Sequence, residues 1–322
     1  MNEIAKPETA AAQGYFSPRR IGHVNLYISE YEPSLRFYRD IVGLCGGWTR
    51  PAISGGFLNN GATHHDIGFI PWNSSVTRTK AVGPGLNHLA FELENEVDLV
   101  GGYERAKAKG TTFQTTDHLI AWSIYSFDPH GYGIEIYADT GLSFEDADFV
   151  KLKRASVGWT PGAEPPSADT RYVKDHRPRR DPNTLFHATK LTGVVLVSDA
   201  FEAARDYYIQ TVGLHPVVTG RDFVCLGGSL SGRDVSIFRA KPGQGPLFHH
   251  MHFSVFDEAD LAQSIAKAGS FGVVVEREID HPRRRGAVVK SPDGARVLLY
   301  VDRAPDAAGL AALTPEEAIW LV

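Results

Sequence analysis

The sequence has few cysteines, no long apolar run and no excess of positive charge. Its 322 residues include two cysteines, Cys45 and Cys225, too few for a disulfide framework or a thiolate metal site. No apolar run approaches the ~20 residues of a membrane-spanning helix, and a net charge of −5 gives no basic surface for nucleic acid. We therefore expect neither a membrane nor a nucleic-acid partner.

The N-terminus lacks the basic region followed by an apolar stretch that marks a signal peptide. We interpret residues 1–17 as a flexible leader and expect a protein of the reducing cytoplasm. A hydrophobic content of 43% and a charged content of 22% are ordinary for a soluble globular protein. The length suits two domains better than one.

Residues 20–140 contain two copies of one repeated unit. Each copy consists of a strand, a helix and then two or three strands. In the first unit these are a strand at 21–28, a helix at 33–42 and strands at 46–50, 56–59 and 64–70. In the second unit they are a strand at 87–93, a helix at 96–108, a strand at 112–114 and a hairpin of strands at 122–127 and 134–137.

The same pattern restarts after a segment rich in proline and charge. The helix and turn at 37–44 are echoed at 207–214, and the turn Asp128-Pro129-His130-Gly131 is echoed by Ser291-Pro292-Asp293-Gly294. Such matches at nearly constant offsets indicate a duplicated domain. We divide the chain into a first domain (16–140), a linker (141–186), a second domain (187–303) and a tail (304–322), whose short helix follows Thr314.

Three residues in the first domain stand out as metal-binding candidates. Alternation along the last strand places Glu135 on the face opposite its two isoleucine neighbours, where a lone carboxylate is expensive to bury. His23 and His88 lie in the first strands of the two units. Taken singly, each residue is more simply explained as a surface or hydrogen-bonded strand residue. Together they place two imidazoles and one carboxylate at equivalent places, enough to hold one face of a divalent metal ion.

The motifs around these residues resemble a known family. The stretches are IGHVNLYI at His23, GLNHLAFELE at His88 and YSFDPHGYGIEIYAD, which contains Glu135. They resemble the vicinal oxygen chelate superfamily and, within it, the type I extradiol ring-cleaving dioxygenases. The resemblance implies an α+β fold of two tandem domains. Each domain would contain two βαβββ modules that form a curved mixed β-sheet barrel around a metal-site cavity. It also implies that the three residues are ligands of Fe(II), with Mn(II) as the alternative metal.

The resemblance extends to three residues beyond the ligands. The segment Thr63-His64-His65-Asp66 is similar to the family's strand that carries an acid–base histidine, and of the pair we choose His65 over His64. Tyr125, ten residues before Glu135, stands where the family has a tyrosine that holds the metal-bound substrate oxygen. His118 falls where the family often keeps another polar residue in the pocket. The catalytic residues implied are therefore His65, Tyr125 and His118.

The second domain serves as an internal control for these assignments. The repeat offsets match Glu135 to Leu298, Tyr125 to Val288 and His23 to Gly193, so that of the metal ligands only His88 keeps a counterpart, His250. We therefore predict that the first domain holds the site and the second is vestigial. This reverses the family's usual order, and the linker becomes a candidate for part of the roof over the pocket.

The function implied is cleavage of the aromatic ring of a catechol-type substrate by O₂, with Fe(II), in the breakdown of aromatic compounds. Two alternatives stay open. One is a metal-dependent glyoxalase-like isomerase or lyase that shares the three ligands but does not need His65 and Tyr125 together. The other is a non-catalytic protein that binds a small aromatic molecule. Open sheet edges also favour a homo-oligomer.

Overall fold

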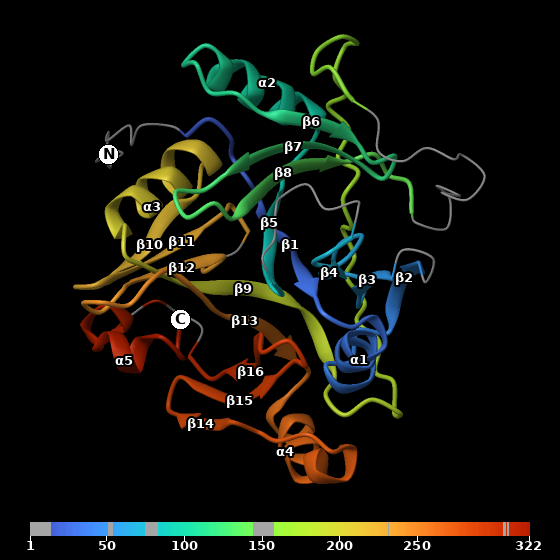
Figure 1. Cartoon of the computed structure of the whole chain (residues 1–322), viewed down its shortest axis with the longest axis vertical. Coiled ribbons are helices and arrows are strands. Elements are labelled where there is room, and N and C mark those ends of the chain that lie inside the picture. The colour runs from blue at the N-terminus through green and yellow to red at the C-terminus, as the bar shows by residue number, and fades with distance from the viewer. Residues whose placement is uncertain are drawn as a thin grey trace, which may run out of the picture.

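The computed structural model of the chain contains two eight-stranded mixed sheets and five short α-helices among its described residues (Figure 1). It describes residues 14–50, 54–74, 83–143, 158–230, 232–304, 307 and 309–322. Most of the predicted leader, much of the loop at 73–85 and the start of the linker lie outside these residues. Within the described part, no helix is long and apolar enough to cross a membrane.

The first sheet comes from the first repeat pair, in the strand order β2-β3-β4-β1-β5-β8-β7-β6. Its strands are β1 (Arg20–Ile28), β2 (Gly46–Arg50), β3 (Gly55–Asn59), β4 (Ile67–Pro71), β5 (Gly85–Glu92), β6 (Gln114–Asp117), β7 (Ala121–Phe127) and β8 (Gly133–Asp139). Its helices are α1 (Tyr31–Arg36), which continues as a π-helical segment (Phe37–Ile41), and α2 (Glu96–Lys107).

The second sheet repeats that order as β10-β11-β12-β9-β13-β16-β15-β14. Its strands are β9 (Ala188–Ser198), β10 (His215–Thr219), β11 (Phe223–Gly227), β12 (Val235–Arg239), β13 (Leu247–Val255), β14 (Arg277–His281), β15 (Arg284–Lys290) and β16 (Arg296–Asp302). Its helices are α3 (Phe201–Tyr207), followed by a second π-helical segment (Tyr208–Val212), and α4 (Glu258–Lys267). The predicted fold class, two tandem domains of paired βαβββ modules, is confirmed.

Local differences from the predicted elements have identifiable causes. The strand expected at 64–70 begins only at Ile67, because side chains rather than a strand ladder hold the segment before it. The Thr63 hydroxyl donates to the carbonyl oxygen of His65, and the Asp66 carboxylate accepts from the amide of Asn60. His64 and His65 therefore lie in an irregular turn and not on opposite faces of a strand. The strand expected at 112–114 starts at its last residue and runs on to 117.

The two sheets share one apolar core on one face and keep separate interiors on the other. Val24 and Leu26 of β1 pack into the same cluster as Val194 and Leu196 of β9. The alternate residues of each strand point the opposite way, into the interior of their own curved sheet. The metal-site candidates belong to the interior of the first sheet.

The tail fills the interior of the second sheet. A capping box on Thr314 starts α5 (Pro315–Ala318), and the chain then enters the domain, where Leu321 and Val322 are buried. They belong to one cluster with interior side chains of the second sheet such as Val288 and Leu298. The cluster that Leu321 and Val322 join thus occupies part of the space that corresponds to the first domain's polar site, beside the buried Arg284, which donates to the Val322 oxygen at 2.7 Å.

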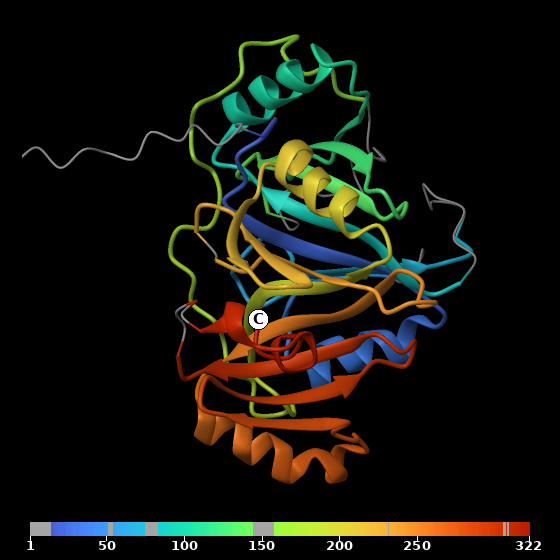
Figure 2. The same cartoon turned by 90° about the vertical axis from the view of Figure 1, so that its left-hand side faces the viewer.

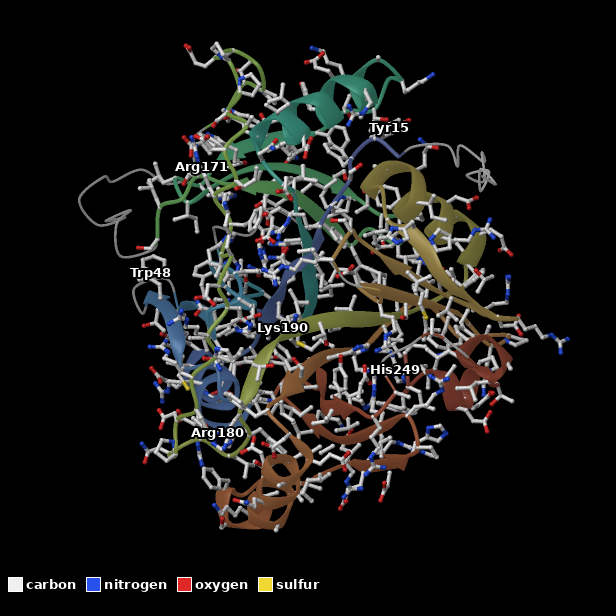
Figure 3. The ribbon with its side chains drawn as sticks, turned by 180° about the vertical axis from the view of Figure 1, so that it is seen from behind. Tyr15, Trp48, Arg171, Arg180, Lys190 and His249 are labelled. Carbon is white, nitrogen blue, oxygen red and sulfur yellow. The ribbon has the colours of Figure 1, made fainter. Side chains whose placement is uncertain are left out.

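Reciprocal hydrogen bonds join the two domains. The Asp66 carboxylate accepts from the Leu191 amide of β9 at 2.9 Å, and the Asp234 carboxylate accepts from the Ile21 amide of β1 at 2.7 Å. Lys190, near the centre of Figure 3, lies close to both carboxylates. Burial and nearby Arg20 lower the pKa of its amine, against the effect of the two aspartates. The domains are therefore linked symmetrically, with α2 and α4 at opposite ends of the molecule (Figures 1 and 2).

The described parts of the leader and linker pack against the domains. Phe16 is buried in the shared core, so residues 14–17 do not form a flexible leader. Trp159 of the linker stacks on Trp122 of β7, with ring centroids 6.3 Å apart. Trp122 alternates with Ser123, which faces the interior, so this part of the linker covers the outer face of the sheet and not the site.

Candidate metal centre

Three central strands bring the predicted ligands together. Ala90 of β5 pairs with His23 of β1 on one side and with Glu135 of β8 on the other, and His88 lies two residues before it. The Nε2 atoms of His23 and His88 are 3.2 Å apart. The Glu135 Oε2 atom lies 3.2 Å from the first nitrogen and 3.0 Å from the second. Three donor atoms therefore point at one place inside the sheet.

These separations suit ligands of one metal ion. Donor atoms at about 2.1 Å from a metal and at right angles to each other lie about 3 Å apart. Two imidazoles and one carboxylate in that arrangement form the facial triad typical of non-haem Fe(II) oxygenases. The residues present fit a divalent ion.

The charge states of the three residues also suit a metal ion. Burial lowers the pKa of His23 to about 4, so that its ring is neutral near pH 7. Burial alone would raise the pKa of the Glu135 carboxyl, but hydrogen bonds and charge interactions with His23 and His88 lower it well below its ordinary value. A neutral imidazole and an ionised carboxylate are the forms that bind metals.

The second carboxylate oxygen of Glu135 has its own partner. The Ser123 hydroxyl, on β7 and fully buried, donates to Oε1 at 2.6 Å. The sequence prediction missed this residue, although alternation along β7 places it on the same face as Tyr125. Oε1 is thus engaged by the protein while Oε2 faces the histidines.

Tyr125 and His118 lie together on one side of the centre. The Tyr125 hydroxyl and His118 Nε2 are 2.8 Å apart, and the Tyr125 ring lies edge-on to the His88 ring with centroids 5.8 Å apart. Both side chains are partly exposed. The structure therefore places a hydrogen-bonded, partly exposed phenol–imidazole pair beside His88.

His65 and His64 lie beside His23. The His65 ring is 5% exposed and packs on the His23 ring, with centroids 3.8 Å apart. Burial, with His23 and His64 adding to it, lowers the pKa of His65 well below 6.5. Burial acts in the same direction on His64, but the Asp139 carboxylate, 2.9 Å from its Nδ1, raises the pKa overall. Sequence reasoning did not identify Asp139 as a partner.

The second sheet has no such centre among its described residues. Its strand pairing matches the first sheet position by position, with Gly193 opposite His252 and Leu298 opposite Val288. His250 instead stacks on Trp320 of the tail, with centroids 4.7 Å apart. Figure 3 shows the neighbouring His249 on the side of the molecule away from Trp48 of the first domain.

Comparisons with known proteins agree with this architecture. The model of the Glyoxalase/Bleomycin resistance protein/Dioxygenase superfamily matches residues 20–136 and 187–299, one match for each domain. The Mn(II)-bound glyoxalase from Novosphingobium aromaticivorans has a similar structure, with a TM-score of 0.66 over 94% of both chains. Its sequence identity of 12% makes this a likeness of fold alone.

Two similar relatives are dioxygenases. The chain is 29% identical over 101 residues to a catechol-2,3-dioxygenase of Bacillus subtilis, and this match covers 30% of this chain and 35% of that protein. It is 28% identical over 160 residues to an iron-dependent extradiol dioxygenase of Rhodococcus jostii, and this match covers 42% of this chain and 48% of that protein. The matches therefore span half or less of these relatives.

Proposed function

The chain belongs to the Glyoxalase/Bleomycin resistance protein/Dioxygenase superfamily, and on that premise we propose that it is a dioxygenase. More specifically, we propose an Fe(II)-dependent extradiol dioxygenase that opens the ring of a catechol-type substrate with O₂. The observation that carries the proposal is the convergence of His23, His88 and Glu135 within 3.2 Å of one another. The named activities of the two similar relatives support it.

The triad suits this reaction because it leaves one side of the metal free. His23, His88 and Glu135 would hold the metal from one side, and a metal held in that way could bind the two vicinal oxygens of a catechol and O₂ from the other. A metal ion bound there would hold both reactants in contact and allow electrons to pass from the ring to oxygen. The protein's task is to fix the ligands, orient the ring and handle protons.

The Tyr125–His118 pair is suited to hold a substrate oxygen. Its members lie beside His88, are partly exposed, and are already bonded to each other at 2.8 Å. The phenol can donate to an oxygen of the bound ring while His118 accepts or returns a proton behind it. We keep His65 as the proposed acid–base residue on the His23 side, where its ring contacts that ligand.

The glyoxalase-like isomerase or lyase is the competing function. It would use the same three ligands, and a similar structure in the superfamily is a glyoxalase that binds Mn(II). The phenol–imidazole pair next to His88 favours the dioxygenase, because it adds a hydrogen-bonding and proton-transfer group that metal binding alone does not require. We therefore treat the isomerase as the outcome to be excluded by experiment.

The test is metal analysis followed by O₂ uptake. The protein is purified without air, its bound metal is measured, and a panel of catechols is added with O₂. A ring-cleaving dioxygenase gives bound iron, a yellow product and uptake of one O₂ per product. Metal without O₂ uptake, together with turnover of a glyoxalase substrate, would establish the competing function instead.

Two variants locate the reaction at this site. His118→Phe and Tyr125→Phe are expected to keep the metal and lose most of the turnover. His176→Phe is the matched control, because His176 lies in the linker and contacts the carbonyl oxygen of Asn60 rather than the metal ligands. Equal activity in all three variants would remove the pair from the mechanism.

A further inference from the structure

The two oxygens of the Glu135 carboxylate have different surroundings. Oε2 faces the Nε2 atoms of His23 and His88 at 3.2 and 3.0 Å. Oε1 points away from them and accepts a hydrogen bond of 2.6 Å from Ser123. The carboxylate is therefore held in one orientation from behind.

The position of Ser123 in the sheet explains this contact. Ser123 pairs with Tyr137 and Tyr125 pairs with Glu135, so the serine is the diagonal cross-strand neighbour of the glutamate on the interior face. Diagonal neighbours on one face of an antiparallel pair are close enough for side chains to meet. Because an ionised carboxylate only accepts hydrogen bonds, the serine hydroxyl is the donor.

The second domain has neither the hydroxyl nor the carboxylate at the matching positions. The same pairing places Gly286 opposite Tyr300 and Val288 opposite Leu298, so Gly286 matches Ser123 as Leu298 matches Glu135. A side chain at Gly286 would have its Cβ 2.9 Å from the Leu298 Cδ1 atom. The hydroxyl and the carboxylate are thus present together in one sheet and absent together from the other.

We propose that Ser123 is a positioning residue that makes Glu135 a one-oxygen ligand of the metal. By occupying Oε1, its hydroxyl leaves only Oε2 to bind, since a carboxylate free of that bond can rotate and bind through both oxygens. A two-oxygen carboxylate would take one more position on the metal. The use of the remaining metal positions for ring cleavage rests on the proposed function. The effect of Ser123 on metal affinity does not depend on that function.

The experiment measures metal affinity in three variants of Ser123. Competition with a chelator, without air, gives the dissociation constant of Fe(II), and the same measurement is made with Mn(II). Ser123→Ala should bind either ion about 10–100-fold more weakly, the usual effect of losing a hydrogen bond to a metal ligand. Ser123→Thr keeps the hydroxyl and should stay close to the wild-type affinity. X-ray absorption at the iron edge should show a carboxylate bound through both oxygens, with its carbon drawn close to the metal, in Ser123→Ala and a one-oxygen carboxylate in the wild type.

Two controls separate positioning from packing. Ser123→Gly tests the site should Ser123→Ala fail to fold, because the matching strand of the second domain already carries glycine there. Ser236→Ala removes another fully buried serine hydroxyl, on β12 of the second domain, and should leave metal affinity unchanged.

The outcomes distinguish this inference from the proposed function. Weaker metal binding in Ser123→Ala with rescue by Ser123→Thr supports the positioning role, even if the wild type turns over no catechol. Catechol cleavage by the wild type, with unchanged metal affinity and an unchanged one-oxygen carboxylate in the alanine and glycine variants, overturns the positioning role and leaves the dioxygenase standing. A loss of affinity that is equal in the alanine and threonine variants also overturns it.

Discussion

Replacing Glu135 by leucine should abolish metal binding without unfolding the protein. Leucine is the residue that the second sheet has at the matching position, where Leu298 is fully buried on the same strand framework. The variant removes a buried carboxylate and adds an apolar side chain of similar size. Replacing a whole buried ion pair by apolar side chains is often neutral or stabilises by about 1–4 kcal/mol, whereas removing one partner costs stability when a buried charge is left behind. Burial keeps the His23 ring neutral near pH 7, so Glu135→Leu leaves no unpaired charge on that ring. The unused Ser123 hydroxyl offsets any such stabilisation by about 1–3 kcal/mol.

The magnitude of the metal effect follows from the size of the chain. A metal ion at one hundred times its dissociation constant stabilises the folded state by about 2.7 kcal/mol. Unfolding entropy is about 2.1 cal/mol/K per residue, which for 322 residues gives about 0.7 kcal/mol/K. The wild type should therefore melt about 4 °C higher with metal than without. Glu135→Leu should show no shift, and without metal it should melt within a few degrees of the wild type.

The assay is thermal unfolding followed by circular dichroism, with and without Mn(II), which avoids oxidation of iron. Glu104→Leu is the control, because Glu104 is exposed on α2 and far from the interior of the sheet. A metal-dependent shift of several degrees that survives in Glu135→Leu would show that the carboxylate is not a ligand. Collapse of the fold in the metal-free variant would refute the equivalence with Leu298.

Three further predictions address catalysis, domain contact and pH. Tyr125→Phe should lower the rate of O₂ uptake by about 10²–10⁴-fold while bound metal stays at the wild-type level, and an unchanged rate would exclude proton transfer through this pair. Asp234→Ala should destabilise the protein to urea by about 3–5 kcal/mol, because the amides of Ile21 and Gly228 lose a charged acceptor; a loss below about 1 kcal/mol would contradict this. Burial, with the charges of nearby arginines adding to it, lowers the pKa of His252 well below 6.5, so the unfolded chain takes up a proton that the folded chain does not. The contribution of this ring to the free energy of unfolding should therefore be fully present above pH 6.5 and be lost as the pH falls below it. In urea unfolding, His252→Leu should reduce the slope of the free energy of unfolding against pH by up to ~1.4 kcal/mol per pH unit. Equal slopes in the variant and the wild type would show that this ring is not kept neutral.

The interior site was predictable where strand alternation decides the direction of a side chain. A period of two fixes which residues of one strand share a face, and it put Glu135 on the face opposite its isoleucine neighbours, whereas Tyr125 was implied only by the family resemblance. Duplication of the domain then showed which of these residues the fold does not require. Ser123 obeys the same alternation, but a single serine carries no chemical signal until its partner is known.

The parts that were not predicted depend on contacts between distant segments. His65 was expected on a regular strand, whereas hydrogen bonds from Thr63 and to Asp66 hold it in a turn. The filling of the second interior by Leu321 depends on a tail that no repeat describes. Neither arrangement leaves a periodic pattern in the sequence, since each is decided by a partner far along the chain.

The reciprocal links explain why the second domain keeps its fold without a metal centre. Asp234 holds the amide of Ile21, two residues before the ligand His23, and the Tyr208 hydroxyl donates to Asp128 in the turn that precedes the strand of Glu135. The second domain therefore fixes both ends of the scaffold that carries the ligands. These contacts do not involve Gly193 and Leu298, the interior positions that match His23 and Glu135, so the second interior can differ from the first without breaking them. The support that the second copy gives to the first therefore depends on its fold and not on a metal site of its own.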